Sequence, residues 1–237
     1  MSSVQRPRRT AERPTVVCFV RHGTTPTTGR LLPGRARGLH LSEAGLEEAK
    51  AAAGRFAGLA VAAVYSSPLE RTRETAAPIA DAVGTTVVVD RGLVECDFGG
   101  WTGSELAKLR KLPEWRAVQH FPSGWRFPAG ESFSELQARM LATVERYRRE
   151  HAGQVVVAVS HADCVKAALA AYLGTPLDLF QRIDVGPCST SAVALGEDGP
   201  RVLALNSYGP LRGLPEAGGP CAGGRRPARQ PREGAAS

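Results

Sequence analysis

The chain has 237 residues, 43% of them hydrophobic and 22% charged, a composition typical of a soluble globular protein with one large domain or two small ones. Its formal net charge of +7 does not point to nucleic acid as a partner, because the first 14 and the last 26 residues each carry three of these charges and neither end interleaves aromatic residues with its arginines. No stretch approaches the roughly 18 apolar residues of a membrane span, and no apolar run near the start has signal-peptide length, so we expect a cytoplasmic protein without a membrane partner.

Short β-rich runs alternate with longer helical patterns, which predicts an α/β fold built on a largely parallel sheet. Apolar periodicity, helix caps and glycine stops define the boundaries of these elements. In chain order they are a strand at 15–20, a helix within 41–59 capped by Ser42, a strand at 61–67, a helix at 69–84 closed by Gly84, a strand at 85–90, a helix at 132–151, a strand at 154–160, a helix at 161–174 and two antiparallel strands around the turn at 196–199.

Residues 91–130 lack this periodicity. The region holds all three tryptophans of the chain and several prolines, and only one short helix, near 104–112, is expected in it. We therefore predict a lid-like excursion over the edge of the sheet.

The two ends of the chain are expected to be disordered. Residues 1–14 form a basic arm, and residues 212–237 are rich in Gly, Pro and Arg and nearly free of large apolar side chains, so neither end buries enough surface to offset its ordering entropy. No repeat or linker divides residues 15–211, and a single domain is predicted there.

Polar residues follow the strands of the predicted sheet. The first strand runs into Arg21 and His22, and the strand at 154–160 runs into His161. Arg71 lies in the first turns of the helix after the second strand, and Glu95 lies on the loop after the third. Ligands of open α/β sheets bind at the carboxyl ends of the strands, so these side chains are expected at one edge.

This combination of residues favours phosphoryl transfer. A neutral imidazole can attack phosphorus when its other nitrogen is hydrogen-bonded, which makes His22 the candidate nucleophile. Arginines meet phosphate oxygens with a charged planar fork, so no metal is required. The sequence contains no P-loop, no Gly-x-Ser-x-Gly and no His-Glu-x-x-His, and its five widely spaced cysteines, expected as reduced and mostly buried thiols, form no zinc-binding pattern.

Five motifs resemble those of the histidine phosphatase superfamily, which includes the cofactor-dependent phosphoglycerate mutases. They occur in family order over roughly residues 15–211: RHGTT at 21–25, SSPLERTRETA at 66–76, LVECDFGGWTG at 93–103, GES at 130–132 and SHADCVKAAL at 160–169. The segments at 31–45 and 173–183 further resemble an actinobacterial branch whose members are labelled phosphomutases or phosphatases. The resemblance implies a phosphoglycerate mutase-like three-layer sandwich in which helices flank a mixed, mostly parallel sheet.

The resemblance also implies a role for each matching residue. His22 would become a phosphohistidine, and Glu95 would first protonate the leaving oxygen and then activate water. The phosphoryl oxygens would be held by the side chains of Arg21, Arg71 and His161 and by the amide of Ala162 at a helix start. Many relatives place an asparagine on the phosphate where this chain offers Thr28 or Thr27, of which we favour Thr28. Arg35 and Trp101 are candidate substrate contacts, each with the alternative of a purely structural place.

Three functions remain open at this point. Hydrolysis of a small phosphorylated metabolite without metal or cofactor is favoured, because only 35 positions separate Glu95 from Gly130, fewer than in the glycolytic mutases this chain resembles. The alternative is a phosphomutase, which would need 2,3-bisphosphoglycerate. A non-catalytic binder of phosphorylated ligands is third, since pure binding requires neither a nucleophile nor a proton donor. The substrate, and the choice between monomer and homodimer, stay open.

Overall fold

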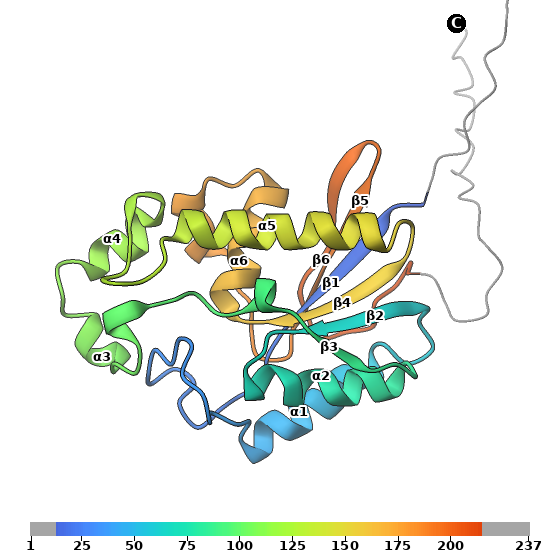
Figure 1. Ribbon diagram of the computed structural model, residues 1–237, viewed down its shortest axis with the longest axis horizontal. Helices are drawn as coiled ribbons and strands as arrows, with labels where there is room; N and C mark the ends of the chain where they lie inside the picture. Colours follow the sequence, from blue (N-terminus) through green and yellow to red (C-terminus); the bar gives the residue numbers. More distant parts are fainter. Residues whose placement is uncertain (1–12, 215–237) are drawn as a thin grey trace, which may run out of the picture.

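The computed structural model describes residues 13–214 and contains one six-stranded sheet (Figure 1). The strand order is β3-β2-β4-β1-β5-β6. The strands are β1 (Thr15–Arg21), β2 (Val61–Ser66), β3 (Val87–Val89), β4 (Val155–Ser160), β5 (Thr190–Gly196) and β6 (Gly199–Ser207). The first four pair in parallel, whereas β5 runs antiparallel to β1 and β6 antiparallel to β5. The predicted mixed, mostly parallel sheet is confirmed.

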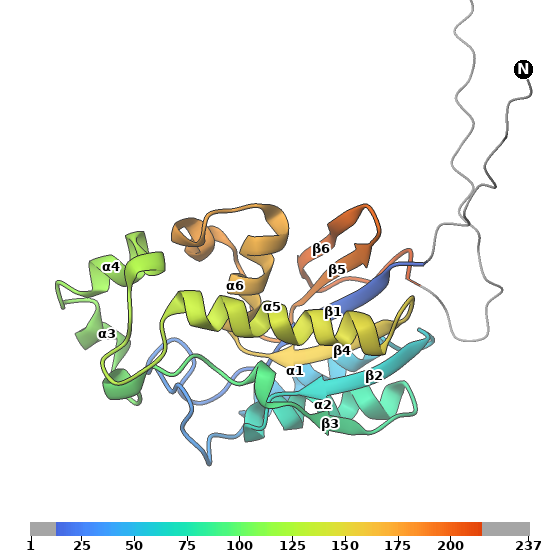
Figure 2. The same ribbon diagram turned by 45° about the horizontal axis from the view of Figure 1, so that its top comes forward.

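Helices cover both faces of this sheet, as Figure 2 also shows. On one side lie α1 (Glu43–Gly54) and α2 (Glu70–Ala82), and on the other lie α5 (Phe133–Glu150) and α6 (Ala162–Leu173). Alternation along β1 explains the two layers: Val16, Cys18 and Val20 pack toward α1 and α2, while Val17 and Phe19 pack toward α5 and α6. The three-layer sandwich is therefore confirmed.

The predicted helix boundaries depend on side-chain caps that the structure contains. Ser42 accepts a hydrogen bond from the amide of Gly45 at the start of α1. Ser132 and Glu135 form a reciprocal capping box at the start of α5. Gly174 ends α6 in the left-handed conformation, with φ of 67°.

The excursion at 91–130 has more structure than the sequence predicts. The single helix expected at 104–112 shrinks to α3 (Leu106–Leu109), and a second helix, α4 (Trp115–His120), was not predicted. Pro113 explains the split, because a proline disfavours helical backbone at the residue before it. Three short 3-10 turns, η1 (Arg91–Leu93), η2 (Gly99–Trp101) and η3 (Pro122–Gly124), complete the region, and η4 (Leu177–Arg182) follows α6. Both views place α3 and α4 at one end of the molecule, beyond the start of α5.

The predicted disordered ends, 1–14 and 212–237, lie almost entirely outside the described residues. Within residues 13–214, no helix is both long enough and apolar enough to cross a bilayer.

Candidate functional site

The carboxyl ends of β1 and β4 bring two histidines together. These strands are parallel neighbours in which Arg21 pairs with Ser160. The residues that follow the two strands, His22 and His161, therefore lie at the same edge of the sheet. Their ring centroids are 5.2 Å apart with an interplanar angle of 64°. The strand-end argument from the sequence predicts this juxtaposition.

His22 is held as a neutral imidazole with one free nitrogen. Its Nδ1 lies 2.8 Å from the carbonyl oxygen of Gly23, which can only accept, so the proton is on Nδ1 and the lone pair is on Nε2. Burial, followed by the positive charge of Arg71, lowers the pKa of His22 to about 3. A ring in this state is an unprotonated nucleophile at neutral pH.

Two arginines near this ring, the half-buried Arg21 and the buried Arg71, each have an unused donor. Arg21 donates from Nη1 to the carbonyl of Val185 at 2.7 Å, and Arg71 donates from Nη2 to the carbonyl of Gly34 at 2.8 Å. The Nε atoms of both are buried and have no acceptor among residues 13–214. Buried charge is costly unless it is paired, so this arrangement is suited to an anion.

His161 is completely buried between protein groups. Its Nε2 lies 2.9 Å from Oγ of Ser67, and its Nδ1 lies 3.4 Å from Nη2 of Arg71. Burial, with Arg71 next, lowers its pKa well below the usual value. Both nitrogens therefore already have protein partners, and direct binding of phosphoryl oxygens by His161 stays a prediction.

Glu95 is a buried carboxyl group with an unusual pKa. Its Oε1 accepts from the amide of Cys96 at 2.9 Å, and the thiol of Cys164 lies 3.6 Å from the same oxygen. Burial, followed by the negative charge of Asp163, raises the pKa of Glu95 to about 7, although Arg71 acts in the opposite direction. Such a group is present in both protonation states near neutral pH, as a residue that first gives and later takes a proton requires.

A cavity of about 490 Å³ connects these groups to the excursion. Its lining includes Arg21, His22, Glu95, Thr27, Thr28 and Ala162 from the predicted site. The sequence did not single out the other polar residues of the wall, Thr25, Arg110, Gln119, Asp163, Lys166 and Gln181. For Asp163 and Lys166 a signal existed, because they share the first turns of α6 with Ala162.

Arg71 and His161, predicted to hold the phosphoryl oxygens, do not line this cavity, and neither do the two residues predicted to contact the rest of the substrate. The Arg35 side chain is engaged by the carbonyl of Glu95 and the carboxylates of Asp97 and Glu131. Trp101 packs inside an aromatic cluster, with its ring centroid 6.2 Å from that of Trp115 and 5.4 Å from that of Trp125. Arg35 and Trp101 therefore have the structural roles that the sequence analysis gave as the alternative to substrate contact.

Four cysteines are buried free thiols, Cys18, Cys96, Cys164 and Cys188, and Cys221 lies outside the described residues. Within residues 13–214, no group of three or more His, Cys, Asp or Glu side chains is arranged to hold a metal ion.

Comparison with known proteins identifies relatives whose names give two different activities, phosphatase and mutase. A sequence profile of the histidine phosphatase superfamily (branch 1) matches residues 17–208. Phosphoserine phosphatase 1 of Hydrogenobacter thermophilus is 34% identical over 178 residues, which are 73% of this chain and 84% of that protein. A probable phosphoglycerate mutase of Yersinia pestis is 34% identical over 180 residues, which are 75% of this chain and 83% of the relative.

A similar fold occurs in a mycobacterial glucosyl-3-phosphoglycerate phosphatase. The two structures superpose with a TM-score of 0.74 at 25% identity, covering 82% of this chain and 100% of the other.

Proposed function

The chain belongs to branch 1 of the histidine phosphatase superfamily, and from this premise we propose that it hydrolyses phosphomonoesters through a phosphohistidine at His22. The chain is a phosphohydrolase of a small phosphorylated metabolite, in keeping with its phosphatase relatives. The observation that carries the proposed mechanism is the neutral His22 ring beside two arginines whose buried Nε atoms have no acceptor in the described part of the chain.

The proposed reaction has two steps. In the first, Nε2 of His22 forms a bond to phosphorus while the ester P–O bond breaks, and protonated Glu95 gives its proton to the leaving oxygen. In the second, ionised Glu95 takes a proton from water, whose oxygen attacks phosphorus and displaces His22. Arg21 and Arg71 balance the charge on the phosphoryl oxygens in both steps, so we expect no metal requirement.

Hydrolysis is preferred over a mutase reaction because a mutase must keep its phosphohistidine from water. Only 35 positions separate Glu95 from Gly130, and they include only two short helices, α3 and α4. An excursion of this size favours access of water to the phosphoenzyme.

The outer part of the cavity favours an organic alcohol that carries a second anionic group. Apolar side chains form much of this wall, including Leu31, Leu106, Trp115 and Phe127. Arg110 is exposed on the same wall and makes no ion pair within residues 13–214, while Nζ of Lys166 lies 3.2 Å from Oε1 of Gln181. Phosphoserine and glucosyl-3-phosphoglycerate, the compounds in the names of two relatives, both carry a carboxylate.

Phosphate release from a panel of phosphomonoesters tests this proposal, with a chelator present and 2,3-bisphosphoglycerate and 3-phosphoglycerate included. We expect hydrolysis of an acidic phosphomonoester, no effect of the chelator, and an acid-labile phosphoenzyme on rapid quench that His22→Asn lacks. Wild-type turnover by His22→Asn would refute the nucleophile assignment. Transfer between 3- and 2-phosphoglycerate that exceeds phosphate release would make the protein a mutase.

A further inference from the structure

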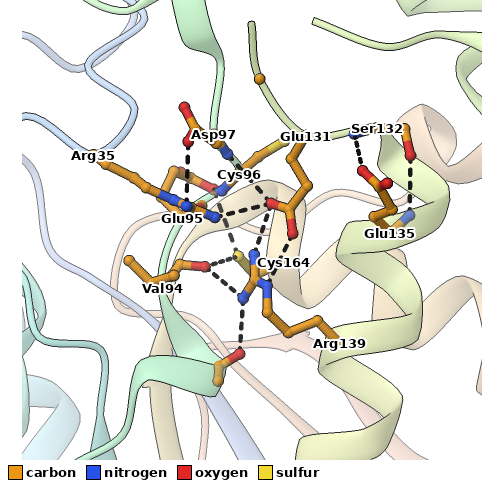
Figure 3. A network of polar contacts seen from close by, with 12 residues as sticks. Arg35, Val94, Glu95, Cys96, Asp97, Glu131, Ser132, Glu135, Arg139 and Cys164 are labelled. Atoms are coloured by element: carbon orange, nitrogen blue, oxygen red, sulfur yellow. Dashed lines mark hydrogen bonds and ion pairs between the residues drawn. The ribbon is translucent and has the colours of Figure 1, made fainter.

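Glu131, in the Gly-Glu-Ser motif before α5, is bound by two arginines (Figure 3). Arg139 of α5 meets it with a two-point contact, Nε to Oε1 at 3.0 Å and Nη2 to Oε2 at 2.9 Å. Nη2 of Arg35 donates to Oε2 at 3.1 Å, and the amide of Asp97 lies 3.3 Å from the same oxygen. The Glu131 side chain is only 13% exposed, so these charged contacts are little weakened by solvent.

The same two arginines hold the backbone on both sides of Glu95. Nη1 of Arg139 donates to the carbonyl of Val94 at 2.9 Å, and Nε of Arg35 donates to the carbonyl of Glu95 itself at 2.8 Å. Neither arginine hydrogen-bonds the Glu95 carboxyl group. The loop is therefore fixed by its main chain, and the carboxyl group keeps its freedom to exchange a proton.

The Arg35 loop also contacts one of the phosphate-site arginines. Arg71 donates from Nη2 to the carbonyl of Gly34 at 2.8 Å, and its Nη1 lies 3.5 Å from the carbonyl of Ala36. The residues on either side of Arg35 are thus bound to Arg71, while the Arg35 side chain is bound to the Glu95 loop. This loop connects the candidate anion site to the candidate proton donor.

We propose that Glu131, through Arg35 and Arg139, is a positioning residue that sets the distance between the Glu95 carboxyl group and the leaving oxygen. Neither Glu131 nor the two arginines line the cavity, and their side chains reach the site through hydrogen bonds to the backbone of the Glu95 loop. The inference rests on the proposed role of Glu95 as proton donor.

A pair of substrates that differ in their leaving group tests the proposal. Release of p-nitrophenol from p-nitrophenyl phosphate needs little protonation, whereas release of phenol from phenyl phosphate does. We expect Glu131→Gln, which keeps the shape of the side chain and removes its charge, to slow the single-turnover burst of phenol from phenyl phosphate by roughly 10- to 100-fold. The burst reports only the first step, whereas kcat also includes hydrolysis of the phosphoenzyme, which is common to both substrates. For the burst of p-nitrophenol from p-nitrophenyl phosphate the expected loss is under about threefold.

Arg35→Gln provides a second variant in case Glu131→Gln folds poorly, and the same selective loss is expected from it. Arg126→Gln is the matched control, since this exposed arginine pairs with Glu135 and donates to the Gly130 carbonyl without touching the Glu95 loop. This variant is expected to leave the ratio of the rates for phenyl phosphate and p-nitrophenyl phosphate at the wild-type value.

Glu95→Gln distinguishes the proton-donor role of Glu95 from the positioning role of Glu131. Selective loss in Glu95→Gln together with equal losses for both substrates in Glu131→Gln and Arg35→Gln would overturn the positioning role alone. Equal losses for both substrates in Glu95→Gln would overturn the proton-donor role and the inference that depends on it. The phosphohistidine at His22 is tested separately, by the rapid-quench experiment.

Discussion

Nδ1 of His161 lies 3.7 Å from Oε2 of Glu95, inside a site where both groups are buried. Burial acts on them in opposite directions, because it disfavours the charged form of each: it lowers the pKa of His161 and raises that of Glu95 to about 7. At neutral pH the His161 ring is therefore uncharged, and a large share of the Glu95 carboxyl groups retain a proton that they can donate.

The pKa of Glu95 predicts the pH dependence of the first step. Formation of the phosphoenzyme from phenyl phosphate requires protonated Glu95, so its rate is expected to be constant below about pH 6 and to fall above about pH 7, approaching tenfold per pH unit. A single-turnover burst of phenol measures this rate. In Glu95→Gln the burst is expected to be slower and free of this alkaline limb, and persistence of the limb in that variant would assign it to another group.

His22 predicts a loss of stability in acid. Its pKa is about 3 in the folded state and about 6.5 when unfolded, so between these values the unfolded chain binds a proton that the folded chain does not. Relative to His22→Gln, the free energy of unfolding of the wild type is expected to fall by about 2 kcal/mol from pH 7 to pH 5. Urea denaturation at several pH values measures this difference. Parallel curves for the two proteins would mean that His22 is protonated in the folded state at pH 5.

Gly45 predicts a steric link between α1 and the His22 loop. A Cβ atom at this position would lie 2.1 Å from the carbonyl oxygen of Thr24, two residues after His22. Gly45→Ala is expected to lower the free energy of unfolding by about 1–3 kcal/mol and to reduce kcat, because the backbone next to the nucleophile must move. Thermal unfolding and turnover of p-nitrophenyl phosphate measure the two effects.

Gly54→Ala, in the same helix, is the control for this substitution. A Cβ atom there meets nothing within 4 Å, so the better helix propensity of alanine should raise stability by up to about 1 kcal/mol without changing turnover. Equal effects of the two substitutions would contradict the steric explanation.

Arg110 predicts selectivity for substrates with a second anionic group. Arg110→Gln is expected to raise KM for an acidic phosphomonoester about tenfold and to leave p-nitrophenyl phosphate unchanged, because only the acidic substrate loses a charge partner. Steady-state kinetics on both substrates measure the difference. Arg116, exposed in the same excursion but absent from the cavity wall, serves as control, and an equal effect of Arg116→Gln would reduce the result to general electrostatics.

The sequence by itself determined the layered fold and the meeting of His22 with His161. Apolar periods and caps encode local structure, and parallel strands that end in histidine place those histidines at one edge wherever the chain packs as an α/β sheet. These local patterns were enough to select His22 as the candidate nucleophile, without knowledge of the residues that surround it in the folded chain.

Only the tertiary structure decided where Arg35 and Trp101 point, that Arg110 and Lys166 share the cavity wall, and how burial shifts the pKa of Glu95. Arg35 turns toward Glu131, 96 residues later in the chain, and Glu131 in turn accepts from Asp97, 34 residues before it. Such contacts form between segments whose own sequence carries no periodic pattern, so no local rule predicts them. Their energies, like the desolvation that sets a pKa, depend on what the folded chain places around each group.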